Sequence, residues 1–264
     1  MAWLSRNDGG MIAVLWWRDT ILFFRQKARI LGALAPPLLL WAAIGAGVTP
    51  SFHAQGAGIG YLEYFYPGVL VVVLLQVSVT ATMSVIEDRR QGFLQGVLAA
   101  PGSRTALVVG KSIGSTTVGL FHAAIFLALA PAAGFALGSM DWSALVAMLA
   151  LVTLALSSAG FALAWWLDSV QAYHVVMGVV LFPLWMLSGA FFPATGQNRV
   201  MEAALAWNPL SYALAGVRRA LYGGQLPDGL GLPGVGALLE FSVVGGAALV
   251  FVALASWVSS RRTS

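Results

Sequence analysis

The chain has 264 residues, of which 59% are hydrophobic and only 9% are charged. Globular proteins are about 45–50% apolar and about 25% charged, so this composition excludes a soluble enzyme and a disordered chain, and the absence of cysteine excludes a disulfide scaffold. Such a composition is typical of a polytopic membrane protein. The net charge is +4, and the positions of the basic residues show whether this charge reflects nucleic-acid binding or membrane topology.

The first predicted element is an amphipathic helix over residues 8–29. Trp17 and Phe24 fall on one side of the helical projection, and Arg18 and Arg25 fall on a neighbouring basic stripe. A basic helix with an aromatic face lies in the plane of a membrane surface, so we expect an interface helix here. The alternative is a short basic segment that merely precedes the first span.

Six apolar stretches follow that are long enough to cross a bilayer, which takes about 20 residues. They cover residues 30–48, 64–86, 112–137, 143–167, 173–192 and 237–258. Six spans place both termini on one side, and eleven of the 14 Lys and Arg residues lie on that side. By the positive-inside rule we expect both termini in the cytoplasm. The basic charge then reflects topology, and no nucleic-acid partner is expected.

Polar and small residues interrupt two of these spans. Gln76, Thr80 and Ser84 recur at every fourth position and form one polar stripe on the second span. Polar groups inside a membrane are candidate functional groups, so the stripe is a candidate pathway lining, with hydrogen bonds between helices as the alternative. Gly110 and Gly114 on the third span predict a close contact with another helix.

A loop that is first charged and then apolar follows the second span. Its apolar middle predicts a short helical turn, and Pro101 with the glycine after it marks the end of that turn. Charged and apolar side chains in one exposed loop are suited to contact with a partner on the cytoplasmic side. The candidate contact residues are Glu87, Arg89, Arg90, Gly92, Phe93, Leu94, Leu98, Pro101 and Arg104.

A second non-spanning segment, residues 193–236, follows the fifth span. Asn208 and Pro209 are predicted to start a short helix as its cap and its first residue, and Gly223 lies beyond the end of that helix. The helix includes Tyr212 and Arg218 and is too short to cross the membrane. We therefore expect it at the outer interface or partly inserted.

Groups that could support catalysis are poorly arranged in this sequence. Residues 110–112 resemble the end of a phosphate-binding loop, but Thr105 stands where that motif requires glycine. His174 and Ser188 lie on one predicted helix at a separation of about 21 Å, too far for a nucleophile and its base. The histidines within the spans lack neighbouring carboxylates for a metal. We expect no enzymatic activity, no metal and no cofactor in this chain.

Three segments carry motifs of one membrane-protein family. The first is the loop after span two, at Glu87, Arg89, Arg90, Gly92, Leu98, Pro101, Arg104 and Gly110-Lys111, although Phe93 and Gln95 stand where Thr and Glu are common. The second is the end of span five, Leu187-Ser188-Gly189-Ala190-Phe191-Phe192-Pro193, and the third is the helix from Asn208-Pro209 through Arg218 to Gly223. Together these segments resemble the permease subunit of ABC-2 type exporters.

The resemblance implies a single all-α transmembrane domain over residues 1–264, with six spans, an interface helix and short outer helices between spans five and six. It also implies a half-transporter that pairs with a second copy of itself or with a sister permease. Two ATP-binding cassette ATPase subunits would bind ATP and Mg²⁺. The interface helix, with Arg18 and Arg25, and the 87–104 loop would face those ATPase subunits.

The family places such a chain in the bacterial cytoplasmic membrane as an exporter. Because the predicted spans contain almost no fixed charge, a hydrophobic, amphipathic or lipid-linked cargo is favoured over small ions. Two alternatives from other classes are a structural or regulatory membrane subunit without a transport pathway and an intramembrane enzyme.

Overall fold

The computed structural model describes residues 8–48, 59–192, 199–227 and 229–261, and within these ranges the protein is all-α, with no strand. Its elements are α1 (Asp8–Arg25), α2 (Lys27–Val48), α3 (Tyr61–Thr82), α4 (Ser84–Arg90), α5 (Phe93–Ala99), α6 (Arg104–Leu127), the 3₁₀ turns η2 (Ala130–Ala133) and η3 (Leu137–Ser139), α7 (Trp142–Trp166), α8 (Val170–Trp185), the π turn η4 (Met186–Ala190), α9 (Arg199–Trp207), α10 (Pro209–Leu221) and α11 (Ala237–Arg261).

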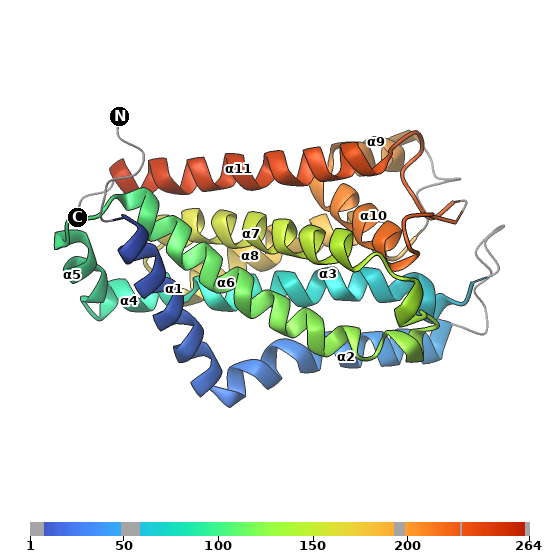
Figure 1. The fold of residues 1–264 in the computed structure, drawn as a ribbon, viewed down its shortest axis with the longest axis horizontal. Coiled ribbons are helices and arrows are strands. Elements are labelled where there is room, and N and C mark those ends of the chain that lie inside the picture. The colour runs from blue at the N-terminus through green and yellow to red at the C-terminus, as the bar shows by residue number, and fades with distance from the viewer. Residues whose placement is uncertain (1–7, 49–58, 193–198, 228, 262–264) are drawn as a thin grey trace.

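The long helices form a bundle whose two ends differ (Figure 1). At one end, called the α5 end, lie α4, α5, the start of α1 and the end of α11. At the opposite end, called the α10 end, lie α9, α10 and the start of α11. Helix α1 crosses the bundle near the α5 end and packs along α6. The segments expected on the two sides of the membrane are thus gathered at the two ends of the bundle.

Within the described residues, five helices are long and apolar enough to cross a membrane. They are Lys27–Gly45 in α2, Tyr61–Arg90 in α3 and α4, all of α7, Val170–Ala190 in α8 and η4, and all of α11. The protein is therefore a multi-pass membrane protein, with two short helices, α9 and α10, between its last two apolar helices. Helix α6 has 24 residues but contains Arg104 and Lys111, and a sixth span stays a prediction.

The helix that contains the third predicted span, residues 112–137, differs from that span at both ends. Helix α6 already begins at Arg104, because the hydroxyl of Ser103 accepts a hydrogen bond from a backbone N–H of its first turn. The helix ends at Leu127, and the apolar residues after it form 3₁₀ turns. Pro131 lies in the first of these turns, where its ring and its missing N–H prevent helix continuation.

The predicted interface helix, residues 8–29, ends earlier than expected. Helix α1 stops at Arg25 and α2 starts after a single intervening residue, Gln26. The face of α1 toward α6 buries Leu15 and Phe23. The aromatic side that includes Trp17 stays exposed. α1 thus has both a protein-facing and an exposed apolar side.

Glycines let α6 approach its neighbours closely. A Cβ atom on Gly110 would lie only 3.1 Å from the backbone of Ile12 in α1, and Gly114 also faces α1. A Cβ on Gly119 would lie 2.5 Å from the side chain of Thr153 in α7. The predicted helix contact at Gly110 and Gly114 is confirmed, and its partner is α1.

Candidate functional site

Four charged side chains from α1, α4 and α6 meet at the α5 end and form what we call the four-charge network. The carboxylate of Asp88 accepts hydrogen bonds from Arg18 at 2.7 and 3.1 Å and from Lys111 at 2.6 Å. Asp19 pairs with both cations at 2.9 Å. The Lys111 side chain is only 3% exposed. Because two cations face two anions, the network buries little uncompensated charge.

Arg18 also joins the network to α5. Its guanidinium carbon lies 3.7 Å from the centre of the Phe93 ring, a cation–π contact. Burial lowers the pKa of Arg18, but the hydrogen bond and the charge of Asp88 outweigh burial and raise that pKa above its ordinary value. Arg18 therefore stays charged and holds α1, α4 and α5 together.

Three other basic residues proposed for partner contact have partners within the chain. Arg89 and Arg90 donate to carbonyl groups at the C-terminal end of α7, and Arg89 also pairs with Asp168 at 3.0 Å. Arg104 donates to the carbonyl of Ser259 in the last turn of α11. These arginines satisfy carbonyl groups that the ends of two helices leave unpaired.

The remaining two charged candidates are more accessible. Glu87 pairs with Arg29 of α2 at 3.0 Å, and both side chains are partly exposed. Arg25, at the end of α1, is exposed. Of the charged candidates on α1, Arg18 is thus held by Asp19 and Asp88 with its side chain 26% exposed, and Arg25 lies at the surface.

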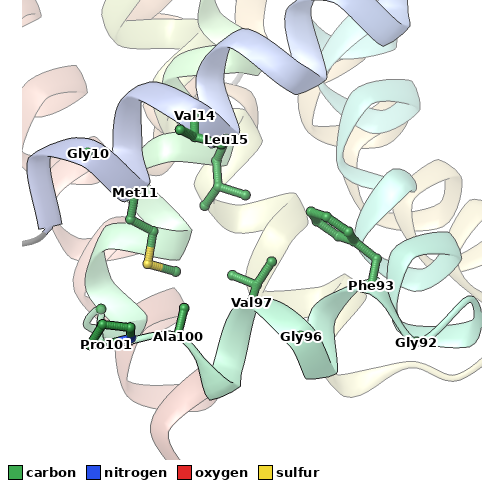
Figure 2. Close-up of a pocket in the computed structure, with 11 residues that line it drawn as sticks. Gly10, Met11, Val14, Leu15, Gly92, Phe93, Gly96, Val97, Ala100 and Pro101 are labelled. Atoms are coloured by element: carbon green, nitrogen blue, oxygen red, sulfur yellow. The ribbon is translucent and has the colours of Figure 1, made fainter.

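An apolar groove of about 830 Å³ separates α1 from α5. Figure 2 shows Met11, Leu15 and Phe93 pointing into the space between the two helices. Gly92 adopts a left-handed conformation with φ of +78° and thereby turns the chain from α4 into α5. Pro101 lines the groove below Met11, at the left of the figure. The groove opens on the side where a partner was expected.

The two leucines proposed for the contact do not line this groove, and they differ from each other in exposure to solvent. Leu94 is 1% exposed and packs into the core, whereas Leu98 is 37% exposed. The periodicity of a short helical turn could not distinguish them, because α5 has only seven residues. Leu98 is therefore available to a partner, and Leu94 is not.

The predicted polar stripe, which lies on α3 and the start of α4, does not form one lining surface. Gln76 lines a cavity of about 310 Å³ between α2, α3 and α8, together with His174. Ser84 lines a separate cavity beside the four-charge network. The hydroxyl of Thr80 donates to the carbonyl of Gln76 in its own helix at 2.8 Å. Of the three residues, only Gln76 contributes to the apolar cavity among the spans.

The predicted start of α10 is confirmed. The side-chain oxygen of Asn208 accepts a hydrogen bond from the Leu210 N–H at 3.0 Å, and Pro209 is the first helical residue. The Asn208 amide also donates to the carbonyl of Leu184 in α8 at 2.6 Å. Tyr212 donates to a carbonyl of α9. Helix α10 is thus fixed to both preceding helices.

Arg218 of α10 is 4% exposed and binds backbone oxygens. It donates to the carbonyls of Gly189 at 2.9 Å and Leu230 at 3.1 Å, and its guanidinium lies 4.4 Å from the centre of the Tyr64 ring. The Tyr64 hydroxyl donates to the same Gly189 carbonyl at 2.7 Å. Gly189 has φ of +86° within the π turn η4, so the predicted motif at the end of span five marks a turn, although its Pro193 lies outside the described residues.

Asp19, Asp88 and Lys111 were missed as site residues by the sequence interpretation. The contacts of Lys111 with Asp88 and Asp19 join positions 23 and 92 residues apart, which no local pattern reveals. One sequence feature could have identified Lys111 as a site residue, namely its position at the edge of an apolar segment. Charges at such positions are rare and need partners. Among the described residues, no cluster of three or more His, Asp or Glu side chains has a metal-binding arrangement.

Comparison with known proteins gives matches over most of the chain. The family model of ABC-2 type transporters matches residues 11–222, which include the four-charge network, the α1–α5 groove and α10. Nodulation protein J of Rhizobium meliloti is 25% identical over 259 residues, covering 92% of each chain. The putative transport permease ycf38 of Cyanophora paradoxa is 25% identical over 206 residues, covering 75% of this chain and 70% of that protein.

Proposed function

Because the chain belongs to the ABC-2 type transporter family and is therefore a multi-pass membrane transport permease subunit, we propose that it forms half of the membrane pathway of an ATP-driven exporter. A second copy of the chain or a sister permease supplies the other half. Two separate ATP-binding cassette subunits bind ATP and Mg²⁺ and hydrolyse the nucleotide. The chain itself contributes a single transmembrane domain and no ATP site.

The observation that carries this proposal is the construction of the α5 end. A conformational change in a soluble subunit reaches the membrane only through packed contacts that differ between two states. The four-charge network joins α1, α4 and α6, and the Arg18–Phe93 contact adds α5. A force applied to α5 would therefore move α1 and the cytoplasmic parts of the spans together.

The proposed contact surface is the exposed side of α5 with the adjoining groove. Leu98 and Gln95 are exposed on α5, and Phe93 and Val97 form the α5 wall of the groove. This surface lies beyond the apolar span that ends at Arg90, so lipid tails do not cover it. An apolar segment of the ATPase subunit would bury these side chains.

The substitution Leu98→Asp tests the contact. A charge at a contact that is desolvated costs several kcal/mol, so co-purification of the ATPase subunit and ATP-dependent export should fall by about tenfold or more. Ser260→Asp is the matched control, because it adds the same charge at an exposed site in the last turn of α11. Leu94→Asp is unsuitable, because Leu94 is part of the core. Wild-type association of the Leu98→Asp chain would exclude α5 as the contact.

The orientation is proposed as cytoplasmic for the α5 end and extracytoplasmic for the α10 end, in the bacterial cytoplasmic membrane. In the described residues, nine Lys and Arg side chains belong to the α5 side of the predicted topology and three to the other side, as the positive-inside rule requires. Gln95→Cys and Gln225→Cys place one thiol at each end of a cysteine-free chain. An impermeant thiol reagent should label only Gln225→Cys in cells with an intact cytoplasmic membrane, and labelling of Gln95→Cys would reverse the assignment.

The cargo is proposed to be hydrophobic, amphipathic or lipid-linked. The cavity between α2, α3 and α8 supports this class, because it is largely apolar, with Gln76 and His174 as its polar lining residues. A transport assay with purified permease, its ATPase subunit and a panel of amphipathic compounds tests the class. Stimulation of ATP hydrolysis only by small ions would contradict it.

A further inference from the structure

The cavity beside the four-charge network, which Ser84 also lines, is polar and has a volume of about 190 Å³. It lies next to the break between α1 and α2. Helices α1, α2, α3, α4 and α6 all contribute to its wall. Gln26, the break residue, and Gln91, just after α4, are exposed at its rim. The cavity is distinct from the groove between α1 and α5, and neither the family nor the proposed ATPase contact assigns it a role.

The charges around this cavity cancel. Arg18, Asp19 and Asp88 of the four-charge network line one side, with Lys111 directly behind them. The pair Arg29 and Glu87 lines the other side. Three cations and three anions therefore surround the cavity. A ligand that carries one positive and one negative charge fits such surroundings better than a free cation or a free anion.

A small polar side chain of α6 also faces the cavity. Ser115 is only 6% exposed and lines the cavity, and no side-chain hydrogen bond engages its hydroxyl within the described part of the chain. The hydroxyl is not one of the fully buried unpaired groups, so it is accessible from the cavity. This hydroxyl can donate to or accept from a ligand in the cavity.

Of the ion pairs around the cavity, the pair of Arg29 and Glu87 is the most exposed and can open at low cost. The side chains of Arg29 and Glu87 are 24% and 36% exposed and meet through contacts of 3.0 and 3.3 Å. A partly exposed pair of this kind contributes little to stability. Asp88 and Lys111 are almost fully buried and fully engaged. A ligand would therefore enter between Arg29 and Glu87.

The cavity lies where an apolar span begins and next to exposed apolar side chains, as expected at the boundary of a membrane. The first apolar span begins at Lys27, one residue after the rim residue Gln26. Leu22, which lines the cavity, and Phe24 and Phe121 nearby on α1 and α6 are exposed apolar side chains, and the two phenylalanine rings stack edge to face at 4.7 Å. A molecule in the cavity would thus have a polar head among charges and an apolar body against these side chains.

We propose that this cavity binds the head group of a zwitterionic aminophospholipid of the surrounding bilayer. The phosphate replaces Glu87 as the partner of Arg29 and accepts a hydrogen bond from Ser115. The primary ammonium replaces Arg29 as the partner of Glu87, to which it can donate through its N–H groups. The acyl chains lie against Leu22, Phe24 and Phe121. Export is not required for this binding, so the inference goes beyond the proposed function.

The purified full-length chain, without an ATPase subunit, is equilibrated with equal amounts of phosphatidylethanolamine, phosphatidylcholine and phosphatidylglycerol, and the retained lipids are quantified by mass spectrometry. Phosphatidylethanolamine should be enriched by about tenfold over both others, the effect of one additional hydrogen bond to a charged group. Phosphatidylcholine lacks ammonium N–H groups, and phosphatidylglycerol lacks the cation.

Three variants locate the site. Glu87→Gln should abolish the preference over phosphatidylglycerol, and Ser115→Leu should lower retention of phosphatidylethanolamine by filling the cavity while it leaves the Arg29–Glu87 pair in place. Arg199→Gln, which removes an exposed charge on α9 at the opposite end of the bundle, is the matched control and should retain the lipid like the wild type.

Equal retention of the three lipids would overturn the proposal, and so would unchanged enrichment in both Glu87→Gln and Ser115→Leu. Soluble phosphoethanolamine that displaces the retained lipid at equal concentration would also overturn it, because the ligand would then be a free metabolite and not a lipid. Since no ATPase is present, none of these outcomes bears on the proposed export function.

Discussion

The two ends of the bundle hold basic residues in different ways. At the α5 end, Lys111 and Arg18 are paired with Asp19 and Asp88 at distances of 2.6 to 3.1 Å. At the α10 end, Arg218 has carbonyl oxygens and an aromatic ring as its partners within the described residues. One end therefore joins side chain to side chain, and the other joins a side chain to the backbone.

Because of this difference, the helices at the α5 end can move relative to one another more easily than those at the α10 end. Side chains on α1, α4 and α6 can exchange partners within the four-charge network while each charge keeps an opposite charge nearby. Movement of Arg218 would instead leave the buried Gly189 and Leu230 carbonyls with fewer donors, which costs about 1–3 kcal/mol for each unsatisfied group. We therefore expect motion at the α5 end and rigidity at the α10 end.

The largest expected effect comes from Lys111→Met. Removal of one partner leaves two buried carboxylates against a single arginine, and such a change costs about 3–5 kcal/mol. Thermal unfolding of the purified chain should show a large loss of stability. The double variant Lys111→Met with Asp19→Asn removes one charge of each sign and should be more stable than Lys111→Met alone. A double variant less stable than the single one would show that the four residues do not act as a balanced network.

Arg218→Lys should have a smaller effect of about 2 kcal/mol, from the loss of charged hydrogen bonds. Lysine keeps the positive charge but lacks the planar fork that reaches separate carbonyls. Arg199→Lys, an exposed position on α9, serves as the control and should unfold like the wild type. If Arg218→Lys also unfolds like the wild type, the positive charge stabilises the α10 end and the hydrogen bonds to the carbonyls do not.

Gly110→Ala tests the packing of α1 against α6 without changing any charged residue of the α5 end. The added methyl would approach the Ile12 backbone, and overpacking of this kind costs about 1–3 kcal/mol. Gly96→Ala on α5 meets no neighbouring atom and should be neutral or stabilising by about 0.4–1 kcal/mol. Hydrogen exchange of α1 should rise in Gly110→Ala only. Equal exchange in the two variants would mean that α1 is not held by this contact.

The smallest effect is expected at Asp141, which caps α7 at the α10 end by accepting a hydrogen bond from the Ala144 N–H at 3.0 Å. This bond lowers the pKa of the exposed Asp141 carboxyl. A lowered pKa in the folded protein means that the contribution to stability is present above the ordinary pKa and is lost as the pH falls. Asp141→Asn should keep the cap and remove the pH dependence, whereas Asp141→Ala should lower the melting temperature at all pH values.

The sequence predicts well what local chemistry determines. Runs of apolar residues located α2, α7 and α11, and the Asn208–Pro209 pair located the start of α10. Apolar content alone misplaced the end of α6, because it does not register that Pro131 and the turns after Leu127 interrupt the helix. The boundary errors thus come from backbone constraints and not from misjudged hydrophobicity.

The site was less predictable than the fold. Glu87, Arg89 and Arg90 were recognised as charged loop residues, but their partners lie in α2 and at the end of α7. Periodicity places residues on a helix face and contains no information on which distant helix that face meets. The same limit hid the pairing of Lys111 with Asp19, which depends on the way α1 crosses α6.

The π turn η4 makes the length of the chain critical at one point. Gly189 has φ of +86°, a left-handed conformation that breaks the helix here, and this break directs the Gly189 carbonyl toward Tyr64 and Arg218. Deletion of a single residue between Met186 and Ala190 would change the direction of this carbonyl and separate it from both donors. Relatives of this protein should therefore vary in amino-acid type within this turn but conserve its number of residues.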